Sequence, residues 1–367
     1  MMVPALEYAR TSDGVSIAYF TVGSGLPIVF ASNIFGDAHL YRSLEWQHVH
    51  GVTDGLSALG WRVVRYDVRG MGASDRNPPD LSLDARVRDL EAVIHRLSLD
   101  RFALAGVDLG AATAVAYAVR HASIVSRLVL LSPWVSGQEM FALPDLRVAS
   151  GMMATGDREW NVFTNVLGNV ASAFEDAALG NEIAAAIRQS TSPDRLAAYY
   201  SASADIDLSD LLPDLNVPVL VIHEPAFPFG SLDLCQAVAK KIPHAQFVVV
   251  REKSIAGTAH HGHVAAIDEF LRSGVGRESA SNLSLERSGP PVAAPSTETR
   301  SSLTAREREV LTRLASGLTN KEIALDLRIS VPTVERHVAN LYSKIGARGR
   351  VDATAWALRH GLLRLGS

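Results

Sequence analysis

Residues 102–112, FALAGVDLGAA, constrain the fold of this chain more than any other segment. The segment begins as an apolar run, becomes rich in small residues, and carries a glycine two positions on either side of Asp108. Glycine and other small residues allow a sharp backbone turn, so the pattern predicts a strand that passes through a tight turn directly into a helix. Such a turn presents the side chain of Asp108 at the amino end of that helix.

Short apolar runs alternate with longer amphipathic patterns over most of the first 272 residues. The expected strands are 28–31, 61–66, 102–105, 127–131, 217–222 and 247–250, and the expected helices are 53–59, 83–97, 111–119 and 232–241. Strands that alternate with helices predict a parallel sheet covered on both faces. Residues 137–212 interrupt this alternation with an insertion rich in alanine, methionine and aromatic residues, which we interpret as a helical cap.

Serine, glycine, proline and charged residues dominate residues 273–302. A segment of this composition has too few apolar side chains to build a core, so we expect a flexible linker. The sequence therefore predicts a large domain at 1–272 and a small domain at 303–367.

The two parts differ in charge. The whole chain has a formal net charge of -4, which by itself argues against binding to nucleic acid. Residues 300–367, however, contain 12 Lys and Arg against 6 Asp and Glu. This asymmetry makes the small domain the candidate for contact with phosphate groups.

Cys235 is the only cysteine of the chain. It excludes an intramolecular disulfide framework and a cysteine-rich zinc module, and we expect it to be a small buried residue on a helix. The first residues do not form a positively charged region followed by an apolar one, and no run of 18 apolar residues occurs. We therefore expect a cytoplasmic protein without a membrane segment.

Helix-capping patterns are frequent in the small domain. Thr304 and Glu307 fit a capping box at the start of one helix, and Thr319 and Glu322 fit a second. Ser330 is expected to cap a third helix that runs to about residue 345, and a fourth is expected at about 350–360. Two short consecutive helices, the second with exposed polar residues, are typical of a helix-turn-helix unit that reads the DNA major groove.

The small domain resembles the C-terminal domain of LuxR-type transcriptional regulators in the stretches REREVL, NKEIA, TVERH and KIG. This resemblance implies that the recognition helix is 330–345 and that the protein binds two-fold symmetric double-stranded DNA as a homodimer. The positions that it assigns to base or phosphate contact are Lys321, Thr333, Glu335, Arg336, His337 and Lys344. Glu335 stands where a basic residue is frequent, and an acid there can accept a hydrogen bond from cytosine but cannot bind phosphate. Arg336 is the best candidate for base readout.

The large domain resembles an α/β-hydrolase in two motifs. One is the turn around Asp108, which has the spacing of a nucleophile elbow, and the other is DVRGMGASD at 67–75. The second motif usually stabilises a loop after a strand, and we assign it no catalytic role. The resemblance implies an α/β fold, with a mostly parallel sheet and a helical cap at about 137–212, followed by a small all-α domain.

Several catalytic positions of the hydrolase family are altered. Asp108 replaces the usual serine or cysteine; haloalkane dehalogenases and epoxide hydrolases also use aspartate there, but commonly follow it with tryptophan rather than Leu109. The loop 32–36, SNIFG, lacks the His-Gly pair that helps to form an oxyanion hole.

The acid and base positions also differ from the family pattern. Glu224 is a poor substitute for the acid expected after the strand at 217–222, and no histidine follows the strand at 247–250 at the usual distance. The nearest histidines come later, at the start of the last helix of the domain, and they are His260, His261 and His263. Their spacing lacks the i, i+4 face of a helical zinc site, so we expect neither a metal nor a cofactor.

Three interpretations of the large domain remain open. A domain that senses a ligand without catalysis needs only Asp108 as a polar anchor. A hydrolase with Asp108 as nucleophile needs His260, His261 or His263 to activate water, because the ester intermediate does not turn over otherwise. A pure dimerisation scaffold needs none of these residues.

The first interpretation gives the most complete account. We expect a ligand-responsive transcriptional regulator in which a small, largely apolar molecule binds under the cap. Because ligands of parallel α/β sheets bind at the carboxyl ends of the strands, the expected ligand contacts are Asn33, Phe35, Asp108, Leu109 and Trp134.

Overall fold

The computed structural model describes residues 4–31, 47–143, 146, 157–171, 177–225, 230–251, 261–273, 303–315, 320–345 and 353. Contacts between residues divide the chain into two compact units, Met1–Arg277 and Glu278–Ser367. Nearly all of the segment 273–302, which the sequence predicts to be a linker, lies outside the described residues. No helix of the described segments has both the length and the apolarity that crossing a membrane requires.

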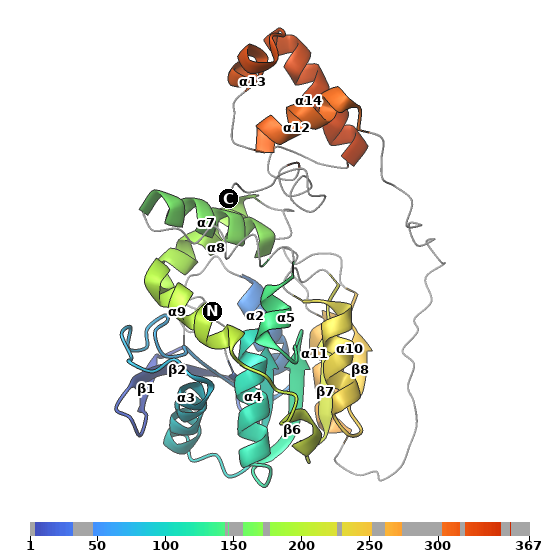
Figure 1. Cartoon of the computed structure of the whole chain (residues 1–367). Coiled ribbons are helices and arrows are strands. Elements are labelled where there is room, and N and C mark those ends of the chain that lie inside the picture. The colour runs from blue at the N-terminus through green and yellow to red at the C-terminus, as the bar shows by residue number, and fades with distance from the viewer. Residues whose placement is uncertain are drawn as a thin grey trace. The chain divides into compact units, whose positions relative to one another are not determined.

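The first unit is built on an eight-stranded, mostly parallel sheet (Figure 1). Its strands are β1 (Glu7–Arg10), β2 (Ser16–Val22), β3 (Leu26–Ala31), β4 (Trp61–Tyr66), β5 (Phe102–Val107), β6 (Val125–Leu131), β7 (Val219–His223) and β8 (Gln246–Val249), in the order β1-β2-β4-β3-β5-β6-β7-β8. The pairs β1–β2 and β2–β4 are antiparallel, and the other pairs are parallel. The six predicted strands are present with small differences at their ends, whereas β1 and β2 were not predicted.

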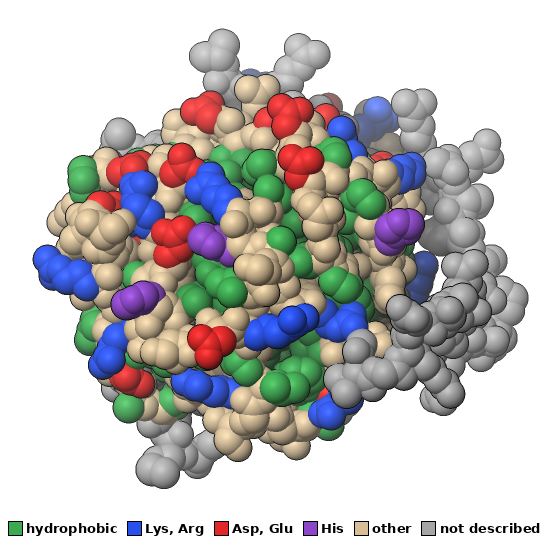
Figure 2. Space-filling model, turned by 90° about the horizontal axis from the view of Figure 1, so that it is seen from below, with side chains coloured by type: hydrophobic (Ala, Val, Ile, Leu, Met, Phe, Trp, Pro, Cys, Tyr) green, Lys and Arg blue, Asp and Glu red, His purple; other side chains and the backbone are tan. Residues whose placement is uncertain are grey.

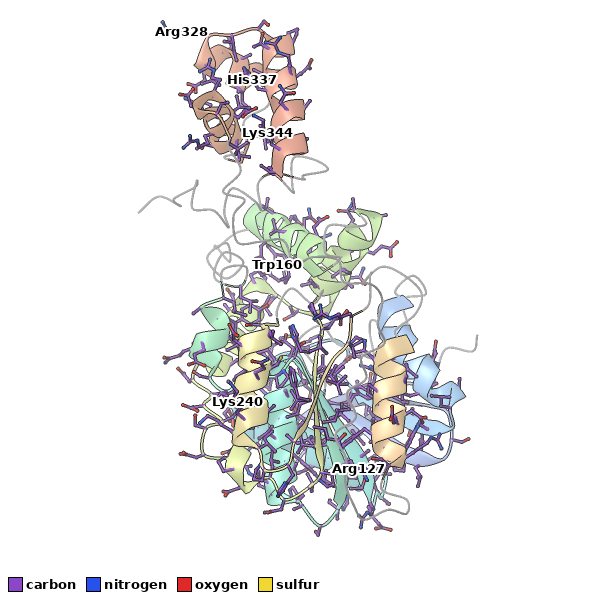
Figure 3. All side chains as sticks on the ribbon, turned by 90° about the vertical axis from the view of Figure 1, so that its right-hand side faces the viewer. Arg127, Trp160, Lys240, Arg328, His337 and Lys344 are labelled. Carbon is purple, nitrogen blue, oxygen red and sulfur yellow. The ribbon has the colours of Figure 1, made fainter. Side chains whose placement is uncertain are left out.

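Helices cover both faces of this sheet (Figure 3). Apolar residues of α2 (Gln47–Ala58) and α11 (His261–Arg272) pack with one set of sheet residues. Those of α3 (Leu83–Arg96), α4 (Leu109–Arg120) and α10 (Leu232–Lys241) belong to the larger core on the other face. Because both faces are covered, the central strands are nearly continuous apolar runs, as the sequence predicts.

The insertion between β6 and β7 is helical, as predicted. It contains α5 (Gly137–Phe141), α7 (Asp157–Ala171), α8 (Ala177–Ser190) and α9 (Pro193–Ala204), followed by the short 3-10 helix η1 (Leu212–Asp214). The helices α7, α8 and α9 lie beyond the carboxyl ends of the central strands (Figure 1). The helices α7 and α8 pack closely together where glycines face each other. A Cβ atom on Gly168 of α7 would lie only 2.1 Å from the carbonyl oxygen of Gly180 of α8, so a larger residue at position 168 would not fit.

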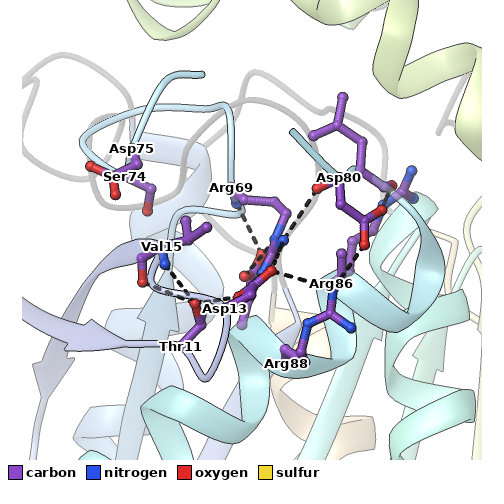
Figure 4. A network of polar contacts seen from close by, with 12 residues as sticks. Thr11, Asp13, Val15, Arg69, Ser74, Asp75, Asp80, Arg86 and Arg88 are labelled. Carbon is purple, nitrogen blue, oxygen red and sulfur yellow. Dashed lines mark hydrogen bonds and ion pairs between the residues drawn. The ribbon is translucent and has the colours of Figure 1, made fainter. Parts of the chain in front are cut away.

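The loop after β4 is held by buried ionic contacts (Figure 4). The Arg69 side chain is fully buried and bonds to Asp89 on α3 at 2.8 Å and to Asp13 in the β1–β2 turn at 2.8 Å. The Asp67 carboxylate accepts a hydrogen bond from the N–H of Ala73, which closes the loop on itself. The motif DVRGMGASD at 67–75, which forms this loop, therefore has a structural role, in agreement with its interpretation from the sequence.

The second unit contains α12 (Ala305–Ala315), α13 (Asn320–Leu327) and α14 (Val331–Ile345) around a small apolar core. The Thr304 N–H donates to Glu307 at 2.8 Å, and the Glu307 N–H donates to the Thr304 hydroxyl at 3.2 Å, which confirms the first capping box. The N–H of Thr333 donates to the Ser330 hydroxyl at 3.3 Å, which confirms the predicted cap of α14. Thr319 and residues 346–352 lie outside the described part.

Replacement of Arg69 by methionine is expected to lower the free energy of unfolding of the first unit by about 3–5 kcal/mol, because it leaves the fully buried Asp89 without its ion pair. The measurement is guanidinium denaturation followed by far-ultraviolet circular dichroism. The matched control is Arg120→Met, which breaks an exposed ion pair with Asp84, also on α3, and is expected to cost less than about 1 kcal/mol. Equal losses in the two variants would contradict this assignment.

Candidate functional site

The turn between β5 and α4 places Asp108 at the carboxyl edge of the sheet. Asp108 has a φ of 49° and a ψ of -117°, a conformation that residues with a side chain rarely adopt. Its N–H donates to the carbonyl of Leu131 on the neighbouring strand at 2.9 Å, and its own carbonyl accepts from Ala111 at 3.0 Å. The surrounding hydrogen bonds thus hold a strained residue whose side chain projects from the turn.

Close packing on the inner side of the turn requires glycine. A Cβ atom on Gly106 would lie 2.7 Å from both the Cα of Ala111 and the Cβ of Ala114. The small residues that the sequence shows around Asp108 therefore allow α4 to approach the end of β5. The predicted strand–turn–helix is present as expected.

The Asp108 carboxyl group is buried, with 8% of the residue surface exposed. Burial raises its pKa to about 7, and a hydrogen bond from the backbone of Leu109 opposes this rise. Its Oδ1 atom has no hydrogen-bond partner within the described structure. At neutral pH this carboxyl group therefore exists as a mixture of the acid and the carboxylate.

The charge of Asp108 affects the pKa values of two tyrosines of α9. Burial raises the pKa of both Tyr199 and Tyr200, and the charge of Asp108 adds to each rise. The Tyr199 hydroxyl is buried and has no hydrogen-bond partner among the described residues. The ring of Tyr200 packs against Phe141 with a centroid distance of 5.1 Å. From the sequence, these tyrosines could be assigned only to the predicted helical cap at 137–212. Their spacing does not reveal which side of α9 faces the sheet.

The two other described residues among the predicted ligand contacts are also buried. Leu109 and Trp134 are 2% and 1% exposed, and the Trp134 Nε1 atom has no hydrogen-bond partner in the described segments. Asn33 and Phe35 lie outside the described residues. The structure thus places unpartnered polar atoms of Asp108, Trp134 and Tyr199 in the region where β5 and β6 end and the cap begins.

Residues that follow β7 and β8 form an acid–histidine pair. The Nε2 atom of His263 lies 3.3 Å from the Oε2 atom of Glu224, and both side chains are largely buried. The histidine lies in the first turn of α11, as the sequence predicts. His260 lies outside the described residues, and the side chain of His261 is not described. Sequence spacing did not reveal this pair, because Glu224 and His263 are 39 positions apart and meet only through the fold.

A second buried histidine ends β7. The His223 Nδ1 atom lies 3.7 Å from the sulfur of Cys235 on α10, and burial lowers the pKa of the imidazole. Burial and the charge of Asp108 raise the pKa of the Cys235 thiol to about 12. The cysteine is therefore a protonated, buried residue, which agrees with its interpretation from the sequence. No group of three metal-binding side chains occurs in the described ranges.

The cap is attached to the sheet domain by arginine side chains. Arg86 of α3 donates to the carbonyl of Tyr199 at 3.3 Å, and its guanidinium carbon lies 3.7 Å from the centre of the Tyr199 ring. Arg76 donates to the carbonyl of Ser190, at the end of α8, at 2.5 Å. Helix α9 also contacts the segment after β4, because Arg195 of this helix donates to the carbonyl of Pro78 at 3.1 Å.

In the second unit, α14 has one apolar and one polar side. Val334 and Leu341 are fully buried in the core of this unit, whereas Glu335 and Arg336 are exposed. Arg336 makes no hydrogen bond or ion pair with any described residue. His337 is half-buried, and the hydroxyl groups of Thr333 and Ser330 are 2.7 Å apart.

Lys344 contributes to the internal structure of this unit (Figure 3). Its ammonium group lies 2.8 Å from the carboxylate of Glu307, so it joins the end of α14 to the start of α12. Burial tends to raise the pKa of Glu307, but the hydrogen bonds from Lys344 and Thr304 outweigh it and lower the pKa overall. The backbone of Lys321 lies in α13, and its side chain is not described.

The face of the first unit that Figure 2 shows carries interspersed charges of both signs. Lys and Arg side chains stand beside Asp and Glu side chains, with apolar side chains between them. A phosphate backbone requires a surface of mostly positive charge. This face therefore lacks the charge pattern of a nucleic-acid interface.

Two family profiles match the chain. Residues 27–264 match the alpha/beta hydrolase fold, and residues 301–357 match the bacterial regulatory proteins of the luxR family. The AB hydrolase superfamily protein YisY of Bacillus subtilis is 33% identical over 127 residues, which are 34% of this chain and 44% of that protein. The transcriptional regulatory protein LnrK of Bacillus subtilis is 48% identical over 60 residues, or 16% of this chain and 27% of that protein. The chain thus spans less than half the length of the curated relatives that it matches.

The fold of the first unit also occurs in solved structures. The esterase RhEst1 from Rhodococcus superposes with a TM-score of 0.61 at 21% sequence identity, over 73% of this chain and 98% of the esterase. At this identity the likeness establishes the fold alone. The chain belongs to the α/β-hydrolase fold family and carries a C-terminal helix-turn-helix domain of the LuxR family of bacterial regulatory proteins.

Proposed function

We propose that the chain is a ligand-responsive transcriptional regulator, in which the α/β-hydrolase domain binds a small, largely apolar molecule beside Asp108. The observation that carries this proposal is the buried Asp108 carboxyl group, whose Oδ1 atom has no hydrogen-bond partner within the described structure. A buried polar atom without a partner costs about 1–3 kcal/mol. A carboxyl group in this position is therefore available to anchor a ligand.

The residues around Asp108 favour an apolar ligand. Trp134, Tyr199 and Tyr200 are all buried, and Phe141 packs against Tyr200. Aromatic side chains bind apolar groups well, and a few polar groups among them fix the orientation of a ligand. A ligand that hydrogen-bonds to Asp108 and contacts these rings needs no metal and no cofactor.

The second part of the proposal is DNA binding by α14. The polar side of this helix carries Arg336 without any partner in the described part of the chain, so its guanidinium group is available for a base. We infer that a homodimer places two such helices on a palindromic site. Ligand binding then acts by favouring one arrangement of the dimer and hence one spacing of the two recognition helices.

One observation favours a second candidate, a hydrolase with Asp108 as nucleophile. The Glu224–His263 pair has the composition of the acid and base of a hydrolytic site, and it follows the strands from which these residues come in this fold. In such a reaction with a haloalkane, a carboxylate oxygen of Asp108 attacks carbon, the carbon–halogen bond breaks, halide leaves and an ester forms. Water, which gives a proton to His263, then attacks the ester carbonyl, and the products are the alcohol, the Asp108 carboxylate and a proton released to solvent.

Replacement of Asp108 by asparagine is expected to weaken the response to a ligand about tenfold or more, the loss of one buried hydrogen bond to a charged group. DNA affinity in the absence of ligand is expected to stay unchanged. The measurement is fluorescence anisotropy of the full chain on a DNA site selected from random duplexes, during titration with compounds that alter wild-type affinity. The control is Asp194→Asn, an exposed carboxylate on α9. A full response of the Asp108 variant would refute the anchor role.

Replacement of Arg336 by alanine is expected to cost about 1–3 kcal/mol of binding free energy on the selected site and to relax the preference at one base pair. The comparison variant is Arg308→Ala, which removes an exposed charge from α12. Binding isotherms on the selected site and on single-base variants of it provide the measurement. If Arg336→Ala weakens binding equally on all duplexes, Arg336 contacts phosphate rather than a base.

If the domain is a hydrolase, the His263→Ala variant is expected to accumulate an ester on Asp108 when it is incubated with styrene oxide or a haloalkane. Ester formation needs only the carboxylate, whereas its hydrolysis needs the histidine. Intact-protein mass spectrometry detects the adduct and peptide mapping locates it. The double variant with Asp108→Asn is the control. Absence of an adduct with every electrophile tested would count against this candidate.

A further inference from the structure

The first turn of α12 holds a buried carboxylate, that of Glu307, which is 4% exposed. Its Oε2 atom accepts hydrogen bonds from the Thr304 N–H at 2.8 Å, from the Thr304 hydroxyl at 2.9 Å and from the Lys344 ammonium group at 2.8 Å. Charge-assisted hydrogen bonds of this length are stronger than those between neutral groups. Because Thr304 holds the carboxylate at the start of the helix, Glu307 is a fixed acceptor for Lys344.

The Glu307–Lys344 pair differs from the other ion pairs that the structure describes in the second unit. In those pairs every side chain is at least 31% exposed, and they are Arg306–Glu309 and Arg313–Asp326. The side chain of Glu307 is only 5% exposed, and that of Lys344 is 39% exposed. A buried carboxylate that loses its cation is strongly destabilised, whereas an exposed pair contributes little. Lys344 is therefore held at Glu307 and is not free to move to a phosphate group.

Apolar packing alone does not fix the rotation of α14 about its own axis. Val334 and Leu341 of this helix pack in the same core as Val310 and Leu311 of α12. Burial of apolar surface has no preferred direction, whereas a hydrogen bond does. Arg336 lies eight positions before Lys344, or roughly 12 Å along the helix axis. A rotation of α14 would displace its side chain, and a bidentate contact with a base requires close alignment.

We propose that Glu307 and Lys344 are positioning residues for DNA recognition: their ion pair fixes the rotation of α14 and so directs Arg336 towards a base. Lys344 has this role in place of the contact with DNA that the resemblance implies. The fixed carboxylate lies at the start of α12 and the ammonium group in the last turn of α14, so the pair joins the two helices. The proposal rests on DNA binding by α14, proposed above, and deepens it.

The dependence of DNA affinity on salt distinguishes a positioning residue from a phosphate contact. A lysine that binds phosphate releases a counterion, so each such contact makes the slope of log K against log salt steeper by about 0.9. The Glu307–Lys344 pair has no net charge and releases no counterion. Loss of Lys344 therefore lowers the affinity for the correct site without changing the slope.

The test measures binding of the full chain to the selected site and to an unrelated duplex of equal length, over a series of salt concentrations. Lys344→Gln is expected to weaken binding to the selected site about tenfold, the loss of one base contact. Its affinity for the unrelated duplex and its salt slope are expected to stay those of the wild type. Lys344→Arg keeps the ion pair and is expected to restore the preference for the selected site. The ratio of the two affinities does not depend on the folded fraction, so it separates positioning from stability.

A second variant, Glu307→Gln, removes the charge from the other side of the pair. Glutamine can take the place of glutamate in a capping box, so α12 keeps its cap. This variant is also expected to bind the selected site about tenfold more weakly, again the loss of one base contact. The matched control is Glu309→Gln, an equal change of charge at an exposed position of α12, which is expected to change the affinity less than about threefold. Should Lys344→Gln be unfolded at the temperature of the titration, Glu307→Gln decides the test.

Two results overturn the positioning role while the wild type still prefers its selected site. In the first, Lys344→Gln makes the salt slope shallower by about 0.9 and weakens binding to both duplexes, as the loss of a phosphate contact does. In the second, Glu307→Gln binds the selected site as tightly as the wild type or more tightly, because its lysine is free to reach phosphate. A wild-type chain that binds every duplex equally would instead refute the DNA reading by α14 proposed above, and the inference would fall with it.

Discussion

The strained turn at Asp108 is the constraint on which the functional part of the structure depends. The residue has a φ of 49°, and Ser132, at the end of the neighbouring strand β6, has the same value. Such conformations cost about 1–3 kcal/mol each and persist only where the surrounding structure enforces them. Here the hydrogen bond from the Asp108 N–H to the Leu131 carbonyl holds the turn in this conformation, and Gly106 allows α4 to pack closely against it. The result is a carboxyl group that is fixed at the edge of the sheet and kept from water, which is the requirement for a high pKa and for strong contact with a ligand.

The cap connects this carboxyl group to the rest of the domain through α9. Arg195 of this helix donates to the carbonyl of Pro78, in the segment after β4, at 3.1 Å, and Arg86 donates to the carbonyl of Tyr199. The loop after β4 is in turn fixed by the buried Arg69 ion pairs. Under the proposed function, a ligand that moves Tyr199 would alter the contact between the Arg86 guanidinium group and the Tyr199 carbonyl. Packed contacts of this kind change between discrete arrangements rather than continuously, so under the proposed function a ligand beneath the cap would act on the rest of the domain through α9.

The sequence predicts the parts of this structure that depend on local patterns. The apolar runs predict six of the strands, and the capping box at Thr304 predicts the start of α12. The hairpin of β1 and β2 was missed, since its strands precede the alternation of strands and helices and pair in the antiparallel sense. The Glu224–His263 contact and the position of Tyr199 were also missed, because each depends on how a helix is rotated against the sheet. Local residue patterns do not specify that rotation; it follows from packing across the whole domain.

Acidic partners within the second unit hold several of its described cations. Arg306, Arg313 and Lys344 are bound to Glu309, Asp326 and Glu307 of the same unit. The cations without an acidic partner among its described side chains are Arg308, Arg328 and Arg336. These three side chains are the described cations of the unit that have no acidic partner within it and could therefore contact phosphate or a base. Two domains on one site bind far more tightly than one, provided that their spacing matches the site. In the proposed homodimer, a ligand that changed the spacing of the two domains would therefore change their combined affinity for one DNA site.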